Sequence, residues 1–246
     1  MPRVPDCAVV TGWRVMTWNL LGSHDPDLGE IAAVIREHDP DVVALQEVRR
    51  GQARRLARRM GWQHVWTRKH YPYSPLVWWR AEGLAIVAPW ALSARLGTTI
   101  TPEASTWTYR HRVLLAATVT RRDGALRVFD THLSGEDADR RIAQARRVAD
   151  RIRADTATTY VLAGDFNTIP DENGQPSETE VLREFGSVGL VDHGGEHTNP
   201  SNQPYQRIDY VLLPTSARWL QTLTPEGDDI WRRLSDHLPV LVEFEV

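Results

Sequence analysis

Tyr160-Val161-Leu162-Ala163-Gly164-Asp165-Phe166-Asn167 is the stretch from which the fold is most readily inferred. Its apolar first half predicts a buried β-strand, and Asp165 and Asn167 follow where that strand ends. Because these two residues are two positions apart, a continuing strand would point both side chains from the same face. A carboxylate and an amide would then meet at one point, which suits a phosphate and a hard metal ion. Taken alone, the string is explained equally well as a turn, because Asp and Asn are common where strands end.

Polar side chains stand at the ends of further apolar runs along nearly the whole chain. Residues 15–19 end in Asn19, residues 41–47 end in Glu47, and an Asp-Thr-His-Leu string at 130–133 places His132 after another run. Asp209 lies at the start of the run at 207–212, and a Ser-Asp-His string at 235–237 places His237 before the run at 238–242. Taken singly, each of these residues is also compatible with an ordinary structural role at a strand end. The ordered series predicts several strand ends that meet around one site.

In this order, the series resembles the endonuclease/exonuclease/phosphatase superfamily of metal-dependent phosphoesterases, which includes pancreatic-type deoxyribonucleases, abasic-site endonucleases, deadenylases, neutral sphingomyelinases and inositol polyphosphate 5-phosphatases. The resemblance covers roughly residues 13 to 246, and its specificity comes from the ordered combination rather than from any one motif. It implies an α/β fold, a four-layer α/β sandwich in which two face-to-face, mostly antiparallel β-sheets are flanked by helices. We expect one such domain over residues 1–246, with 1–12 as a short N-terminal extension.

Periodicity places the elements of this fold along the chain. The predicted helices span residues 27–37, 51–60, 136–153 and 177–186. The predicted strands span residues 13–19, 42–47, 62–67, 83–88, 92–99, 111–120, 125–131, 159–164, 206–213, 217–223 and 239–245. The plan of strand, polar end and helix occurs in each half, which is consistent with an internal duplication.

Composition is that of a soluble globular protein. The 246 residues are 41% hydrophobic and 25% charged, and the formal net charge of −3 argues against binding of nucleic acid through overall basicity. Cys7 is the only cysteine, so an intrachain disulfide or a cysteine-rich zinc site is excluded. The N-terminal apolar run at 7–10 is too short for a signal-peptide core. We expect a cytoplasmic monomer without stable membrane association.

Two groups of arginines are compatible with a local surface patch that binds nucleic acid. They lie on the predicted helices that follow Glu47 and His132, at 49, 50, 54, 55, 58 and 59 and at 140, 141, 146, 147, 151 and 153. The favoured interpretation is a pair of solvated helix faces, because apolar residues at helical spacing give the second helix a separate buried stripe.

A divalent cation is part of what the resemblance implies. Glu47 is the first candidate ligand, with Asn19 and Asp236 beside it either directly or through water. Oxygen ligands with no cysteine favour Mg²⁺, with Mn²⁺ as the alternative, over Zn²⁺. Considered alone, Glu47 is also compatible with a surface acid next to a helix start.

The resemblance also implies catalytic roles. His237 would lie closest to the attacked phosphorus and be oriented by Asp209, acting either as a general base or as a cationic phosphate clamp. Asp165 would orient or deprotonate the attacking water, and Asn167 would donate to a phosphate oxygen. His132 matches the second histidine of the deoxyribonuclease-like members, on the leaving-group side.

Two further residues are candidates for substrate binding. Glu82 occupies the position of the acid that supports the second histidine in those members, although it is equally compatible with a solvent-facing strand start. Arg112 matches an arginine that contacts phosphate, with an exposed strand arginine as the alternative.

The predicted function is therefore Mg²⁺-dependent hydrolysis of phosphodiester bonds by in-line attack of water. The favoured substrate is a nucleic acid or nucleotide. A lipid or inositol phosphoesterase is the alternative, supported by the aromatic loop at 70–79, although Tyr205-Gln206-Arg207-Ile208-Asp209 stands where inositol 5-phosphatases carry Trp-Cys-Asp-Arg. A non-catalytic binding module is the third and least favoured possibility, because every matched position carries the expected residue type.

Overall fold

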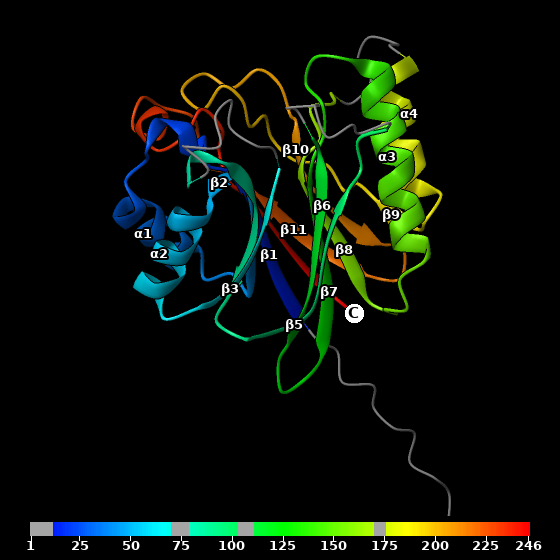
Figure 1. The fold of residues 1–246 in the computed structure, drawn as a ribbon, viewed down its shortest axis with the longest axis horizontal. Helices are drawn as coiled ribbons and strands as arrows, with labels where there is room; N and C mark the ends of the chain where they lie inside the picture. Colours follow the sequence, from blue (N-terminus) through cyan, green and yellow to red (C-terminus); the bar gives the residue numbers. More distant parts are fainter. Residues whose placement is uncertain (1–11, 70–78, 103–110, 170–175) are drawn as a thin grey trace, which may run out of the picture.

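Two six-stranded sheets form the centre of the molecule, and the computed structural model describes residues 12–69, 79–102, 111–169 and 176–246 (Figure 1). The first sheet contains, in spatial order, β11 (Arg218–Leu223), β12 (Val240–Glu245), β1 (Gly12–Asn19), β2 (Val42–Arg49), β4 (Glu82–Ala88) and β3 (Gln63–Arg68). The second contains β5 (Ala91–Thr99), β6 (Val113–Thr120), β7 (Ala125–His132), β8 (Tyr160–Asp165), β10 (Asp209–Pro214) and β9 (Leu190–Val191).

The two sheets share one pairing pattern. In each, the central pair is parallel, β1 with β2 and β7 with β8, while the strands on either side pair antiparallel. Each parallel pair is connected by a helix, α1 (Leu28–His38) in the first sheet and α3 (Ala138–Arg153) in the second, as parallel pairing requires. This common pattern matches the repeated plan of strand, polar end and helix in the two halves of the sequence.

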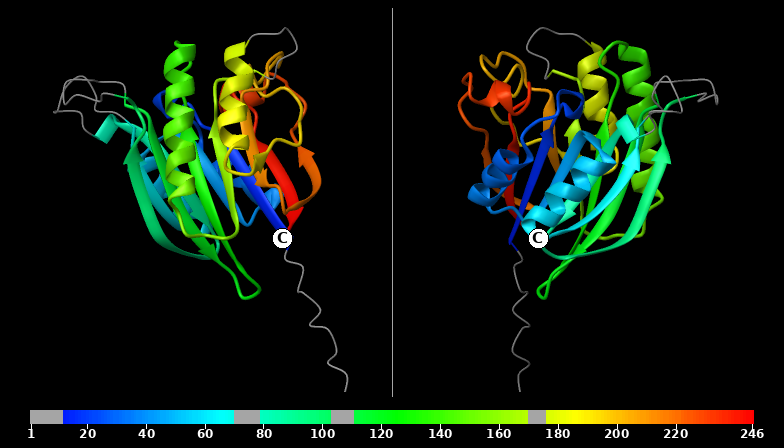
Figure 2. Two further views of the ribbon diagram at one scale, coloured as in Figure 1. Left: turned by 90° about the vertical axis from the view of Figure 1, so that its right-hand side faces the viewer. Right: turned by 60° about the vertical axis from the view of Figure 1, so that its left-hand side comes forward.

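Helices cover the outer faces of both sheets and complete a four-layer sandwich. Figures 1 and 2 show α1 and α2 (Arg50–Met60) on one side and α3 and α4 (Pro176–Gly186) on the other. Apolar residues from both sheets fill the space between them, including Val15, Val42 and Leu84 from the first and Leu115 and Val161 from the second. The predicted fold class is confirmed.

Capping residues set the helix boundaries. The Asp27 side chain accepts hydrogen bonds from the backbone N–H groups of the first turn of α1, and Asp137 caps α3 in the same way. After α1 the chain turns through Asp39 at φ 42° and reaches Pro40, which cannot continue the helix. Gly61 ends α2 at φ 73°, a left-handed conformation in which glycine has no steric penalty.

The predicted elements are all present, with their ends shifted by a few residues. The largest shift is in the strand predicted at 206–213, which begins at Asp209 because Gln206 pairs with Asn199 across a loop. Strand β9 was not predicted, since two residues are too few to show a periodic pattern. Most of the aromatic loop at 70–79 lies outside the described residues, and Trp79 at its end is 56% exposed.

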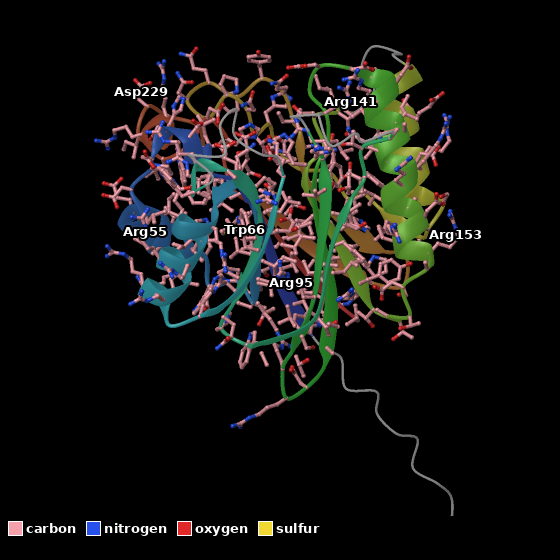
Figure 3. All side chains as sticks on the ribbon, viewed as in Figure 1. Arg55, Trp66, Arg95, Arg141, Arg153 and Asp229 are labelled. Atoms are coloured by element: carbon pink, nitrogen blue, oxygen red, sulfur yellow. The ribbon has the colours of Figure 1, made fainter. Side chains whose placement is uncertain are left out.

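The arginines of α2 and α3 lie on the outer surfaces of the two helical layers. Figure 3 shows Arg55 and Arg153 on opposite sides of the molecule, pointing away from the sheets. Arg141 is an exception to the predicted solvated face, because it is buried and donates to the carbonyl oxygen of Ser134 at 2.9 Å. Among the described residues, no helix is both long and apolar enough to cross a bilayer.

Candidate active site

Strand direction brings the predicted residues to one end of the sandwich. Asn19, His132 and Asp165 are the last residues of β1, β7 and β8, and Glu47 lies near the end of β2. Antiparallel strands start at that same end, where Glu82 opens β4, Asp209 opens β10, and His237 precedes β12. Because the end of one strand lies beside the start of its antiparallel neighbour, these side chains share a single edge of the two sheets.

A β-bulge turns Glu47 toward this edge. Between Leu45 and Val48 the register of β2 against β4 shifts, so that Gln46 and Glu47 lie opposite the single residue Leu84. Glu47 takes the left-handed conformation with φ 51°, which is uncommon for residues other than glycine. Bulges of this kind redirect a side chain, and here the redirected group is the predicted metal ligand.

A row of four side chains then crosses from one sheet to the other. Glu47 Oε1 lies 3.7 Å from His132 Nδ1, and His132 Nε2 lies 3.4 Å from Asp165 Oδ2. The same Asp165 oxygen lies 4.0 Å from His237 Nε2. Residues separated by up to 190 positions in the chain thus meet in one site, with Glu47 at one end of the row and His237 at the other.

His237 is held as a cation by Asp209. Asp209 Oδ2 lies 2.8 Å from His237 Nδ1 and accepts a second hydrogen bond from Thr198 Oγ1 at 2.6 Å. Burial on its own would lower the pKa of His237, but the charge and hydrogen bond of Asp209, with further attraction from Asp165 and Asp236, raise the pKa to about 10. The predicted pairing of His237 with Asp209 is present in the structure.

Asp165 is the central carboxylate of the site. Its Oδ2 accepts from Asn19 Nδ2 at 3.0 Å, and its Oδ1 accepts from the backbone N–H of Asn167 at 3.0 Å. Burial raises the pKa of Asp165 to about 6, although His237 and the Asn19 hydrogen bond oppose the rise. Asn167 adopts φ 48° and donates through Nδ2 to the Leu133 carbonyl at 3.1 Å. Its amide keeps a second N–H for another acceptor.

Lys69 is a site residue that the sequence analysis missed. Its Nζ lies 2.9 Å from Glu47 Oε1 and 3.4 Å from His132 Nδ1, and the residue is only 8% exposed. Burial alone would raise the pKa of Glu47, but Lys69, Arg112 and His237 hold that pKa below its usual value. Lys69 follows β3, whose sequence carries no motif, so no pattern in the sequence pointed to it.

The remaining predicted residues border this row. Glu82 is nearly buried, and burial together with the nearby Glu47 raises the pKa of its carboxyl group. Burial and, after it, the charge of Arg112 lower the pKa of Lys69, and Arg112 also contributes to the lowered pKa of Glu47. The Asp236 side chain is half exposed, and its Oδ1 lies 4.0 Å from His237 Nε2.

A hydrogen-bonded polar bridge links the two sheets next to the site. Gln46 Nε2 donates to Asp130 Oδ1 at 2.7 Å and to Thr17 Oγ1 at 3.0 Å. Asp130 is fully buried, and burial raises the pKa of its carboxyl group well above the usual range. The bridge joins β2 of one sheet to β7 of the other, one residue before Glu47 and two residues before His132.

A protein-family model described as the endonuclease/exonuclease/phosphatase family matches residues 16–237. The chain belongs to this family. Its members hydrolyse phosphoester bonds in a metal-dependent reaction, so the chain is a phosphoester hydrolase, and the resemblance seen in the sequence is confirmed. No curated protein sequence matches the chain significantly.

Several solved structures have the same fold as this chain. A family protein from Beutenbergia cavernae DSM 12333 is 26% identical, with a TM-score of 0.74 over 96% of this chain and 72% of that one. ANGEL2, a 2',3'-cyclic phosphatase, is 16% identical, with a TM-score of 0.72 over 96% and 95%. The mannosyl-6-phosphatase Bt3783 from Bacteroides thetaiotaomicron VPI-5482 is 16% identical, with a TM-score of 0.72 over 94% and 99%. At 16% identity, the last two show the fold alone.

The site can hold the metal ion on which the endonuclease/exonuclease/phosphatase family depends. Asp165, Asp209 and His237 offer ligand atoms that lie within 4.8 Å of one another and could hold an ion. In this group, however, Asp209 Oδ2 and His237 Nδ1 already bind each other. Glu47 and Asp236 add two more carboxylates at the same edge. Oxygen-rich sites of this kind suit hard divalent cations.

Proposed function

We propose that this enzyme hydrolyses phosphodiester bonds with Mg²⁺, by in-line attack of water, and that its substrate is a nucleic acid or a nucleotide. The row from Glu47 through His132 and Asp165 to His237 is the observation that carries the proposal. It sets a carboxylate between two imidazoles, one of which is held as a cation. Such a row supplies a proton acceptor for the attacking water and positive charge for the phosphoryl oxygens.

Glu47, Asn19 and Asp236 are the proposed cation ligands. Asn19 Oδ1 accepts one hydrogen bond, from the backbone N–H of Leu21 at 3.1 Å, and an amide oxygen has a second lone pair to offer. The Asp209–His237 pair is left intact by this assignment. When bound, Mg²⁺ would neutralise negative charge on the phosphoryl oxygens. Mn²⁺ takes similar oxygen ligands and is the proposed substitute.

The remaining groups have roles that follow from their charge. His237 is the phosphate clamp rather than the base, because an imidazole with a pKa of about 10 has no free lone pair near neutral pH. Asp165 orients the attacking water and accepts its proton. Asn167 and Arg112 hold the phosphoryl oxygens that do not react, and His132, whose Nε2 lies 3.4 Å from Asp165 Oδ2, holds that carboxylate in place.

The pH profile follows from the two central groups. Burial raises the pKa of Asp165 to about 6, and its charged form is the proton acceptor, so kcat/KM should rise with pH up to that value. A bound divalent cation favours the carboxylate, which places this limb at or below about pH 6. His237 loses its charge only near pH 10, so activity should fall there. Initial rates from about pH 5 to about pH 11 test this, and a fall near the ordinary histidine value of about 6.5 would contradict it.

A substrate panel tests the proposed function. The purified enzyme is incubated with single- and double-stranded DNA, RNA, cyclic nucleotides, bis-p-nitrophenyl phosphate and phosphomonoesters, each with Mg²⁺ and with chelator. We expect Mg²⁺-dependent cleavage of at least one phosphodiester and slower release from the monoesters. Turnover of monoesters alone, or no metal-dependent turnover of any phosphodiester, would refute the proposal. The His237→Ala variant, purified in parallel, controls for contaminating nucleases.

A further inference from the structure

Lys69 is the only lysine in the chain. The other 28 of its 29 lysine and arginine residues are arginines. It is also among the least exposed cations of the molecule, at 8%, whereas the arginines of α2 and most of those of α3 are in solvent. A lysine presents a compact ammonium with three rotatable donors, and arginine presents a wide planar fork. A buried position that carries the single lysine of an arginine-rich chain therefore points to a requirement for the compact group.

The backbone fixes where this ammonium lies. Lys69 directly follows β3, and its backbone N–H donates to the carbonyl oxygen of Glu82 at 2.9 Å, which extends the pairing of β3 with β4 by one residue. Glu82 in turn starts β4 beside the bulge that carries Glu47. The Lys69 side chain thus extends toward Glu47 from a backbone position that is fixed by strand pairing.

The contacts of the ammonium determine the state of His132. An ammonium group has donors and no acceptor, so at the 3.4 Å contact with Lys69 Nζ the Nδ1 atom of His132 must be the acceptor. A neutral imidazole carries its single proton on one nitrogen. That proton is then on Nε2, the atom that lies 3.4 Å from Asp165 Oδ2.

We propose that Lys69 is a positioning residue that fixes two groups of the site at once. Its ammonium binds Glu47 Oε1 and so assigns the other carboxylate oxygen to the cation, and it holds neutral His132 with the proton on Nε2, directed at Asp165. The part that concerns the cation rests on the proposed function. The part that concerns the His132 tautomer stands independently of it.

Nitrogen-15 NMR of histidine-labelled, metal-free protein tests the tautomer directly. Nδ1 and Nε2 of a neutral ring have distinct shifts when protonated and unprotonated, and His132→Gln identifies the His132 signals among the nine histidines. In the wild-type protein we expect unprotonated Nδ1 and protonated Nε2. In Lys69→Met, which keeps the apolar stem and removes the ammonium, we expect a mixture of both tautomers. A wild-type His132 with its proton on Nδ1, or unchanged shifts in Lys69→Met, would overturn the proposal.

Kinetics separate positioning from simple structural support. At saturating Mg²⁺ we expect Lys69→Met to lower kcat by about 10- to 100-fold, the usual range for a partner that orients a metal ligand, with little change in KM. Lys69→Arg keeps the charge but not the geometry, and should recover only part of the loss. Arg58→Met, which removes an exposed cation of α2, is the control and should leave kcat unchanged. Full activity of Lys69→Met would refute the role.

These measurements also distinguish the proposal from the proposed function. If the wild-type enzyme turns over no phosphodiester but His132 has the expected tautomer, the proposed function fails and the positioning role of Lys69 stands. If turnover is seen but the His132 tautomer does not change in Lys69→Met, the positioning role of Lys69 fails and the proposed function stands.

Discussion

The His237→Ala variant should lose on the order of 10³-fold or more in kcat with little change in fold, as expected for removal of a preorganised charge from the transition state. In the structure His237 is a buried cation paired with Asp209 at 2.8 Å and lies 4.0 Å from the Asp165 carboxylate. Its removal takes away the positive charge nearest the proposed proton acceptor. Steady-state kinetics with Mg²⁺ on the phosphodiester selected by the panel measure the loss.

Two further variants show whether charge is the reason. His193→Ala removes an exposed histidine that stacks on Trp219 outside the site, and should leave kcat unchanged. Asp209→Asn keeps a hydrogen-bond acceptor for His237 but removes the charge that raises its pKa to about 10. The alkaline limb of the pH profile should therefore move to lower pH. Retention of more than a tenth of the activity in His237→Ala would contradict the assigned role.

The Glu47→Gln variant should lose most of its Mg²⁺ and Mn²⁺ binding and, with it, on the order of 10³-fold in kcat, because the cation contributes several kcal/mol of charge stabilisation. The change keeps the size of the side chain and removes one negative charge. Even loss of an outer partner typically lowers metal affinity about 10- to 100-fold, so loss of a direct ligand should exceed that. Isothermal titration calorimetry with Mn²⁺ measures the affinity.

A thermal readout accompanies this variant, because Glu47→Gln leaves the Lys69 ammonium without its 2.9 Å partner. A cation that binds only the folded state raises Tm, by an amount set by its concentration relative to Kd. We expect Mn²⁺ to raise Tm of the wild type and of Glu37→Gln, an exposed glutamate of α1 used as the control, but not of Glu47→Gln. An equal rise in all three would contradict the assignment of Glu47.

The fold could be predicted because each buried strand appears in the sequence as an apolar run. Strands such as β8 read as short apolar runs that end in a polar residue, and the helices carry cap residues such as Asp27 and Asp137. What the sequence does not record is pairing over long distances. Gln206 was assigned to a strand, yet it pairs with Asn199, and the two-residue β9 forms only because β10 offers an edge.

The site was predicted in part for the same reason. Residues at strand ends, such as Asn19, Asp165 and His237, could be inferred because strand order brings those ends together. Lys69 and the buried Asp130 could not, because their roles depend on which side chains they meet across the two sheets. The bulge at Glu47 was equally invisible, since a shift in register leaves no pattern in a single strand.

The position of Mn²⁺ in a crystal, located by its anomalous scattering, tests the proposed cation site most directly. We propose that Glu47, Asn19 and Asp236 hold one divalent cation beside an intact His237–Asp209 pair. We therefore expect an anomalous peak within coordination distance of Glu47, with the His237–Asp209 hydrogen bond unchanged. A peak bound by Asp165, Asp209 and His237 instead, or no peak at this edge of the sheets, would contradict it.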